Sequence, residues 1–178
     1  MVKIKKYFFL ILYRTFARHL PGTGSLFGGK FYKGLRAYCC KNIFRKCGKN
    51  VNIEHGAFFN KGFEIELGDN SGIGYYCVVP DNIKIGNDVM MGPRCYILDR
   101  NHDISRTDIP MWKQGFVKKD TVIEDDVWIG REVIFTPGRT VRKGGVIGAG
   151  CILTKDFPEY SIIGGNPSRF IRSRLGTN

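Results

Sequence analysis

The sequence predicts a mainly β protein, a solenoid of short parallel strands that follows a helical segment at the N-terminus. The first observation is that an apolar side chain recurs every six residues, most regularly between Thr121 and Thr154. A period of six fits neither an α-helix nor an alternating strand, and short self-similar repeats are typical of solenoids. The second observation is that 23 of the 178 residues are glycine, which suits a chain that turns often.

The positive charge of the chain lies before the repeats. Residues 1–49 contain twelve Lys or Arg and no Asp or Glu, whereas residues 50–178 contain sixteen basic and sixteen acidic residues. Such a segment favours an anionic partner, either a lipid surface, a phosphate-bearing substrate or nucleic acid, and a solvated helix face is the alternative. No nucleic-acid recognition motif is present, so no nucleic-acid partner is predicted.

The basic segment, residues 1–49, is predicted to be helical. Its apolar run at residues 7–13 is too short to span a bilayer and lacks the cleavage site of a signal peptide. Residues 1–20 are expected either to contact a membrane peripherally or to pack on the solenoid or a neighbouring subunit. A second amphipathic helix is predicted at residues 30–46, with Gly48 as its C-cap glycine.

A β-helix is predicted for residues 50–155. Each repeat is interpreted as a flat strand and a turn, and three repeats of six residues close one triangular coil, so that coils stack about 4.8 Å apart. Two interruptions occur, a two-residue slip after Phe59 and a gap of twenty-six residues before Ile123. The residues predicted to point inward are Ile53, Phe59, Leu67, Ile73, Val79, Ile85, Met91, Ile97, Ile123, Ile129, Phe135, Val141, Ile147 and Leu153.

The gap marks an excursion loop at residues 99–120, which keeps no period and contains His102. A long irregular segment in a regular solenoid is usually functional. Residues 156–178 are predicted to form a C-terminal cap and tail, because the last coil needs protection against edge pairing. At the corner before the tail, Arg139 occupies a position that should hold a small residue, so this corner is expected to open outward.

The six cysteines are interpreted as packing residues. Cys77, Cys95 and Cys151 each follow an inward position by four residues, which is the small-residue position of the repeat. The other three lie in the basic segment without a Cys-x-x-Cys pair or a nearby His, so no metal site is predicted. This pattern fits a reducing compartment, and the expected location is the cytoplasm, with the inner face of the membrane as the site of any peripheral contact.

Several motifs resemble those of the hexapeptide-repeat acetyltransferases, which fold as a left-handed parallel β-helix. The resemblance is to the galactoside, maltoside and xenobiotic O-acetyltransferases and their relatives from capsule and lipopolysaccharide gene clusters. It implies a left-handed coil, a homotrimer with active sites between subunits, and acetyl-CoA as co-substrate without a metal. The motifs are IGREV at 129–133, IGAGC at 147–151, NHD at 101–103, DDVWIG at 125–130, PG at 137–138, LTKD at 153–156 and GGNPSRFIR at 164–172.

The resemblance implies that His102 is the catalytic general base. An imidazole with a pKa near neutrality suits removal of the proton from an attacking hydroxyl and its return to the departing thiolate of CoA. No Ser or Cys nucleophile motif is present. Asp99 and Asp103 are candidates to orient the imidazole, and these two residues with Asn101 are the predicted substrate contacts.

The resemblance also implies a CoA groove along the ladder of repeats. The backbone amide of Arg131 would stabilise the oxyanion, and the small residues Gly148 and Ala149 would admit the pantetheine arm. Guanidinium groups in the tail suit the nucleotide phosphates. Trp128 lines the thioester end or packs at a corner. The predicted cofactor-binding residues are Trp128, Arg131, Gly148, Ala149, Thr154, Lys155, Arg169 and Arg172.

The expected function is an acetyl-CoA-dependent O-acetyltransferase acting on a sugar hydroxyl in cell-envelope polysaccharide biosynthesis, whether of capsule, exopolysaccharide or lipopolysaccharide. Positions near Gly72 and Pro80, polar in the sugar-scavenging relatives, are not polar here, which argues against a simple galactoside or maltose. N-acetylation of an amino sugar or nucleotide-linked amino sugar is the alternative. A zinc hydratase on this fold would need three His ligands, and an antifreeze-like scaffold a regular Thr or Ser array, and neither pattern is found.

Overall fold

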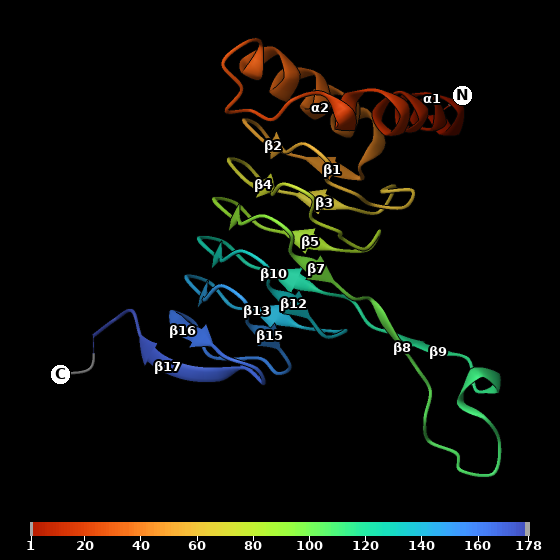
Figure 1. The fold of residues 1–178 in the computed structure, drawn as a ribbon, viewed down its shortest axis with the longest axis vertical. Coiled ribbons are helices and arrows are strands. Elements are labelled where there is room, and N and C mark those ends of the chain that lie inside the picture. Colours follow the sequence, from red (N-terminus) through yellow and green to blue (C-terminus); the bar gives the residue numbers. More distant parts are fainter. Residues whose placement is uncertain (1, 177–178) are drawn as a thin grey trace.

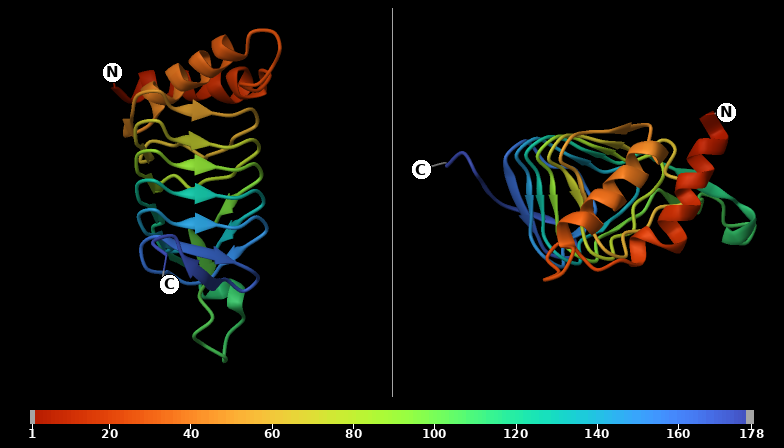
Figure 2. Two further views of the ribbon diagram at one scale, coloured as in Figure 1. Left: turned by 90° about the vertical axis from the view of Figure 1, so that its left-hand side faces the viewer. Right: turned by 90° about the horizontal axis from the view of Figure 1, so that it is seen from above.

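The structure is a solenoid of short strands with two helices across one end and a two-stranded arm that projects from its side (Figures 1 and 2). The computed structural model describes residues 2–176, and Met1, Thr177 and Asn178, which end the expected N-terminal segment and C-terminal tail, lie outside the described residues. The helices are α1 (Val2–Thr15), the 3-10 turn η1 (Ala17–His19), α2 (Gly29–Ile43) and the 3-10 turn η2 (Met111–Lys113).

The strands form stacked, mainly parallel sheets, one for each face of the coil. One sheet runs β1-β3-β5-β10-β13, a second β6-β11-β14-β16-β17, and a third β7-β12-β15, while β2 pairs with β4 and β8 with β9. The strands are β1 Lys46–Cys47, β2 Asn52–Ile53, β3 Glu66–Leu67, β4 Gly72–Ile73, β5 Lys84–Ile85, β6 Met90–Met91, β7 Tyr96–Ile97, β8 Arg100–His102, β9 Phe116–Lys118, β10 Val122–Ile123, β11 Trp128–Ile129, β12 Ile134–Phe135, β13 Thr140–Val141, β14 Val146–Ile147, β15 Ile152–Leu153, β16 Ser161–Gly164 and β17 Arg169–Ser173.

The register confirms three repeats per coil. Ile129 pairs with Ile147, and Phe135 pairs with Leu153, each eighteen residues along the chain. In the first coil the partners are twenty residues apart, as for Asn52 and Gly72, which confirms the two-residue slip. All fourteen side chains predicted to point inward are buried, with exposed fractions of at most 9%. Stacking therefore joins the inward residues of successive coils into one continuous core.

Close stacking explains the glycine that follows many inward residues. At Gly130, a Cβ atom would lie 2.6 Å from the backbone nitrogen of Ala149 in the next coil. Only glycine lets the two backbones approach this closely at the corner. The three predicted packing cysteines, Cys77, Cys95 and Cys151, are also buried, as expected for the small-residue position of the repeat.

The second helix ends earlier than predicted. It stops at Ile43 instead of residue 46, because Lys46 and Cys47 form β1 and pair with β3. The prediction that Gly48 is the C-cap of this helix is wrong. The N–H of Gly48 donates to the carbonyl of Leu67 at 2.8 Å, and a Cβ at this position would lie 2.5 Å from the nitrogen of Asp69. Gly48 therefore serves the first coil, where two backbones meet.

The helices are fixed to the first coil by a buried arginine. Arg36 in α2 is fully buried and donates to the carbonyls of Ile53, at 2.5 Å, and Pro21, at 2.8 Å. Its guanidinium lies 3.8 Å from the carboxylate of Glu54. Burial lowers the pKa of Arg36, an effect that Glu54 opposes. This ion pair ties α2, the loop before it and β2 together, and its removal would leave a buried charge without a partner.

The corner at Arg139 was predicted to open outward, and in the structure it does not. The Arg139 side chain folds back along the solenoid and is 19% exposed. It donates to the carbonyl of Thr154 at 3.0 Å and pairs with Asp156 at 3.4 Å. At the end of the solenoid β17 pairs antiparallel with β16, which covers the edge of the last coil as expected. Within residues 2–176 no helix is long and apolar enough to cross a membrane.

The inward column should carry most of the stability of the solenoid. Ile85 on β5 is 3% exposed, and its neighbour Lys84 points to solvent. Ile85→Ala should lower the free energy of unfolding by about 2–5 kcal/mol, because it leaves a cavity between coils. Lys84→Ala, the matched control, should change it by less than about 0.5 kcal/mol. Chemical denaturation at one protein concentration measures both, and equal losses would contradict this assignment of the core.

Candidate active site

The excursion predicted at residues 99–120 is a two-stranded arm with a short turn of helix at its far end (Figure 1). Strands β8 and β9 pair antiparallel, with His102 opposite Phe116. The two rings lie 4.3 Å apart between centroids. His102 is exposed, and it lines a pocket of about 300 Å³. The pocket is bounded by the arm residues Asn101, His102, Asp103, Ile104, Ser105 and Val117 and by Lys119 and Pro137 of the solenoid.

The two carboxylates expected near His102 are occupied elsewhere. Asp99 accepts hydrogen bonds from the guanidinium of Arg100 at 2.9 and 3.0 Å, and these bonds lower the pKa of its carboxyl group. Asp103 accepts the backbone N–H of Ser105 at 2.9 Å, which lowers its pKa. Neither carboxylate has a hydrogen bond to His102. Asp99 instead forms an ion pair where the arm leaves the solenoid, and Asp103 stabilises the loop after β8.

Five residues of the His102 pocket were not predicted as site residues: Ile104, Ser105 and Val117 of the arm, and Lys119 and Pro137 at its base. Lys119 and Pro137 occupy equivalent corners of successive coils, and Lys155 is the next position along this corner. The coils that contain Lys119 and Pro137 are in close contact, because a Cβ on Gly138 would lie 2.8 Å from the Cβ of Lys119. The eighteen-residue spacing counted back from Lys155 would have identified both residues as neighbours at the base of the arm.

Trp128 and Arg172 line a second pocket, of about 430 Å³, on the face formed by β6, β11, β14 and β16. Trp128 is 54% exposed and stands between Met90 and Val146 in the sheet. Arg174 also lines this pocket and was not anticipated. Its guanidinium donates to Asp126 at 3.0 Å and to the carbonyl of Gly144 at 2.7 Å, and so holds the tail against the solenoid.

Arg131, Gly148 and Ala149 lie at the corner between this face and the β7-β12-β15 face. The Arg131 side chain is exposed and lies 3.9 Å from Glu132, so it is not committed to a close ion pair. Its backbone N–H donates to no other group within residues 2–176. A Cβ on Gly92 would come within 2.7 Å of that nitrogen, so glycine is needed beside it. The corner thus presents a free amide next to two small residues.

Thr154, Lys155 and Arg169 lie near the end of the solenoid. The backbone N–H of Thr154 donates to the hydroxyl of Ser168 at 3.0 Å, and its own hydroxyl lies 3.1 Å from the same oxygen. The ammonium of Lys155 stands 5.6 Å from the ring centre of Phe157. Arg169 begins β17 and is exposed, three residues before Arg172. Thr154 is therefore partly committed to the cap, whereas both arginines remain open to an anion.

Two of the pockets hold different predicted residues: Asn101, His102 and Asp103 line one, and Trp128 and Arg172 line the other. The arm leaves the solenoid away from β17, as two views of the molecule show (Figures 1 and 2). No residue lines both the His102 pocket and the Trp128 pocket. Within a single chain, His102 is thus separated from Trp128 and Arg172.

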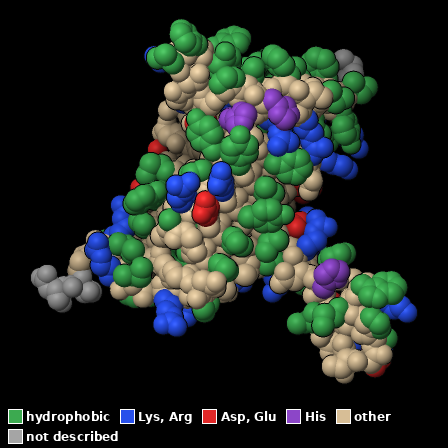
Figure 3. Space-filling model, in the orientation of Figure 1, with side chains coloured by type: hydrophobic (Ala, Val, Ile, Leu, Met, Phe, Trp, Pro, Cys, Tyr) green, Lys and Arg blue, Asp and Glu red, His purple; other side chains and the backbone are tan. Residues whose placement is uncertain are grey.

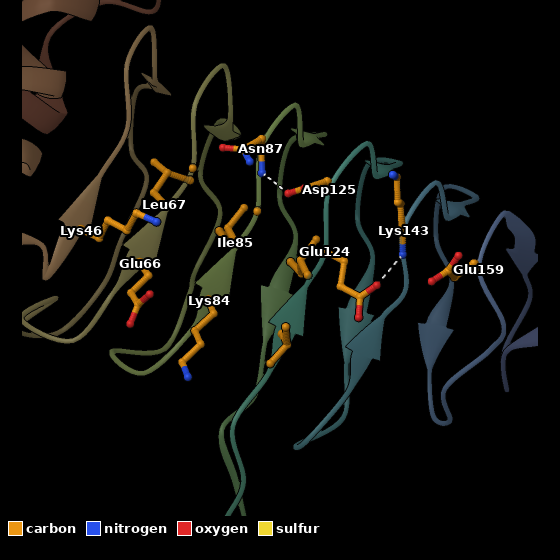
Figure 4. A pocket seen from close by; sticks show the side chains of 14 residues that line it. Lys46, Glu66, Leu67, Lys84, Ile85, Asn87, Glu124, Asp125, Lys143 and Glu159 are labelled. Carbon is orange, nitrogen blue, oxygen red and sulfur yellow. Dashed lines mark hydrogen bonds between the residues drawn. The ribbon is translucent and has the colours of Figure 1, made fainter.

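A third groove, of about 410 Å³, lies along the β1-β3-β5-β10-β13 face (Figure 4). Basic and acidic side chains alternate along it, including Lys84, Glu124, Lys143 and Glu159. Two of its carboxylates hold successive coils together, because Glu124 accepts the N–H of Lys143 at 2.8 Å and Asp125 accepts the N–H of Asn87 at 2.6 Å. The groove contains none of the predicted catalytic or cofactor-binding residues.

The thiols of Cys39 and Cys47 and the metal-binding residue types offer no second chemistry within residues 2–176. Burial raises the pKa of Cys39 and of Cys47 to about 11, so both thiols are protonated near neutral pH and poorly nucleophilic. Across residues 2–176 no three His, Cys, Asp or Glu side chains are grouped to hold a metal ion. His102 is the titratable side chain best placed for proton transfer at the arm.

Known proteins share this fold and are similar to the chain in sequence. A maltose O-acetyltransferase from Clostridium difficile 630 is 30% identical, and the match covers 97% of this chain and 87% of that protein, with a TM-score of 0.76. A galactoside acetyltransferase in complex with coenzyme A is 26% identical, with a TM-score of 0.77 over 97% of this chain and 82% of that one. The galactoside O-acetyltransferase of Escherichia coli strain K12 is 31% identical over 135 residues, 74% of this chain and 65% of that protein.

The chain belongs to the hexapeptide-repeat acetyltransferases, and its solenoid is a left-handed parallel β-helix of the kind found in the galactoside and maltose O-acetyltransferases. No profile of a known protein family matches it. The chain spans 57–65% of the length of three curated relatives that it matches.

The ion pair at the root of the arm gives a pH-dependent test. Because Arg100 lowers the pKa of Asp99, the pair stabilises the arm above the ordinary pKa of an aspartate, and this contribution is lost as the pH falls through the lowered value. Arg100→Gln should raise the pKa of Asp99. Asp103, whose pKa is lowered by the N–H of Ser105, is the internal control and should not change. Carboxyl NMR titration measures both, and an unchanged Asp99 would contradict the pair.

Proposed function

We propose that this protein is an acetyl-CoA-dependent O-acetyltransferase that transfers the acetyl group to a sugar hydroxyl. The observation that carries the proposal is an exposed histidine, His102, at the root of an arm on a β-helix of the hexapeptide-repeat acetyltransferase family. The relative solved with coenzyme A supports this choice of co-substrate.

His102 acts as the general base in this proposal. Its imidazole accepts the proton of the sugar hydroxyl while the hydroxyl oxygen attacks the thioester carbonyl of acetyl-CoA. The tetrahedral intermediate collapses with cleavage of the carbon–sulfur bond, and the imidazolium returns the proton to the thiolate. The products are the acetyl ester and CoA, and no covalent enzyme intermediate is required. General-base catalysis of this kind contributes about 10²–10⁴-fold.

The other predicted residues serve the cofactor. The unpaired N–H of Arg131 is available to an oxyanion at the corner. Gly148 and Ala149 leave the backbone accessible to a narrow pantetheine arm, and Lys155 adds a cation beside Thr154. Arg169 and Arg172 are exposed and suit the phosphates of CoA, because guanidinium donors match two phosphate oxygens at once. Trp128 offers an apolar wall for the thioester end.

We propose that a neighbouring copy completes the site in a homotrimer. The arm carries exposed apolar side chains that no part of its own chain covers within residues 2–176, among them Ile104, Met111 and Trp112, which are 68%, 63% and 72% exposed. The solenoid presents complementary apolar residues, such as Met90 and Trp128. Docking the arm of one copy against the next solenoid would bury both surfaces and place His102 beside the cofactor face.

The acceptor proposed is a sugar of a cell-envelope polysaccharide or its precursor, contacted by Asn101, Asp99 and Asp103 around the arm. The surface at Gly72 supports an acceptor other than a simple galactoside or maltose. The polar side chains beside Gly72 already form hydrogen bonds within the protein and are not free to bind a sugar. Asn52 donates to Glu54 at 2.9 Å, and Glu54 also accepts the N–H of Thr23 at 3.0 Å. Screening sugar and amino-sugar acceptors for CoA release separates O-acetylation from N-acetylation.

Removal of the imidazole should abolish most of the activity. His102→Ala should reduce turnover by about 10²–10⁴-fold, because no other group takes the hydroxyl proton, while the affinity for CoA should stay within about twofold. His19→Ala is the matched control, since His19 is exposed and its ring is hydrogen-bonded, among the described residues, to the carbonyl of Arg14 alone, at 3.0 Å. Acetyl transfer to an active acceptor and CoA titration provide the two measurements. A turnover within a few-fold of wild type for His102→Ala would exclude it as the base.

A further inference from the structure

The helical end of the molecule exposes an apolar strip. Helix α1 turns Phe9 and Tyr13 toward the core and leaves Ile4, Phe8 and Ile11 on its outer face, exposed by 75%, 62% and 62%. Hydrophobic side chains and Lys or Arg gather over this end of the molecule (Figure 3). The outer face of α1 thus has the apolar side of an amphipathic helix and no covering element within residues 2–176.

The strip continues from α1 onto α2. Phe8 contacts Phe9 edge to face, with ring centroids 5.3 Å apart, and Phe9 contacts Tyr38 of α2 in the same way at 5.4 Å. Tyr38 is 57% exposed, and Phe31 lies two turns before it on the same helix face, 69% exposed. The exposed aromatic side chains of α1 and α2 are therefore joined through the buried ring of Phe9, and both helices expose apolar side chains at this end of the molecule.

A groove rich in lysine adjoins this surface. It has a volume of about 760 Å³ and lies between α2 and the first coil, with Tyr38 shared between the groove and the strip. Among the described residues no lysine of the groove forms a salt bridge. Lys33 donates to the side-chain oxygen of Asn50 at 3.1 Å, and the carboxylate of Asp69 accepts the backbone N–H of Lys49 at 2.7 Å. The lysines of the groove are Lys30, Lys33, Lys41, Lys46 and Lys49.

We propose that this helical end binds the surface of a bilayer that contains anionic phospholipids. Residues 1–49 hold twelve basic and no acidic residues, so the whole segment is complementary to a negative surface. The strip of Ile4, Phe8 and Ile11 enters the boundary between headgroups and acyl chains, and the lysine groove holds lipid phosphates beside it. The contact is peripheral, and it is independent of the acetyl-transfer chemistry at the arm.

The charge of this surface disfavours a second copy of the chain as its partner. A two-fold contact places the same patch of each subunit against the other. Here that contact would bring two lysine grooves together without acidic partners from residues 1–49, and the like charges would repel. An anionic lipid surface satisfies both the apolar strip and the lysines.

Vesicle binding of the full chain tests the proposal. Sedimentation with vesicles of phosphatidylcholine and phosphatidylglycerol in equal parts should remove the protein from solution, whereas pure phosphatidylcholine should bind at least about tenfold more weakly. Phe8→Ser with Ile11→Ser, and separately Lys33→Gln with Lys41→Gln, should each weaken binding by about tenfold or more. All four side chains lie on the outer faces of the helices or in the groove, outside the buried core.

Matched controls separate this surface from general charge and hydrophobicity. Ile171→Ser removes an apolar side chain that is 61% exposed on β17, and Lys84→Gln with Lys143→Gln removes two charges from another face. Both should leave vesicle binding within about twofold of wild type. Equal binding to both kinds of vesicle, or equal loss in the controls, would overturn the proposal. Two further results would overturn it. One is no binding to vesicles but binding to duplex DNA, and the other is no binding to vesicles but self-association that Phe8→Ser with Ile11→Ser abolishes.

Discussion

The eighteen-residue register of the parallel coils is the constraint on which the rest of the structure depends. Apart from the arm and the β16-β17 pair at the end, each described strand bonds to strands one coil before or one coil after it, so an error in spacing would move inward side chains out of the core. Burying one such side chain contributes about 1.5–3 kcal/mol, and the sum over the column holds the coils together. The glycine corners follow from the same spacing, because the backbones meet there too closely for a side chain.

The arm shows how the solenoid accommodates an insertion. Ile85 pairs with Ile123, a separation of 38 residues, and Ile123 pairs with Val141, a separation of 18. The chain therefore leaves the coil after Ile97, forms β8 and β9, and re-enters in register. Asp99 and Arg100 bind each other at the exit point, and this fixes where the arm begins. The insertion carries the proposed base outward without disturbing the core of the solenoid.

Much of the fold was predictable, because the buried residues of the solenoid recur in the sequence at a regular spacing. The inward residues, the slip after Phe59 and the arm all follow from counting in sixes. The end of α2 did not follow, because pairing of β1 with β3 overrides the local helical pattern. Nor did the burial of Arg36 follow from the sequence, since it depends on carbonyls from Ile53 and Pro21 that only the fold brings together.

The sequence names candidate site residues one by one, but it does not give their arrangement. Family motifs identify His102 and Arg131, yet they do not say that Asp99 is bound to Arg100 instead of the imidazole. Nor do they give the neighbours Lys119 and Pro137, which depend on the register across the arm. The separation of His102 from Trp128 within one chain depends on the direction in which the arm leaves the solenoid, a tertiary feature.

The central claim is that His102 of one copy acts on acetyl-CoA held by the next. Co-assembly of two inactive variants tests it most directly. His102→Ala removes the base, and Ala149→Trp blocks the proposed groove at an exposed position. Random mixing in a trimer leaves about a quarter of the sites with both parts intact, so mixed assemblies should recover about a quarter of wild-type activity. No recovery in assemblies that contain both variants would place the whole site within one chain and contradict the account.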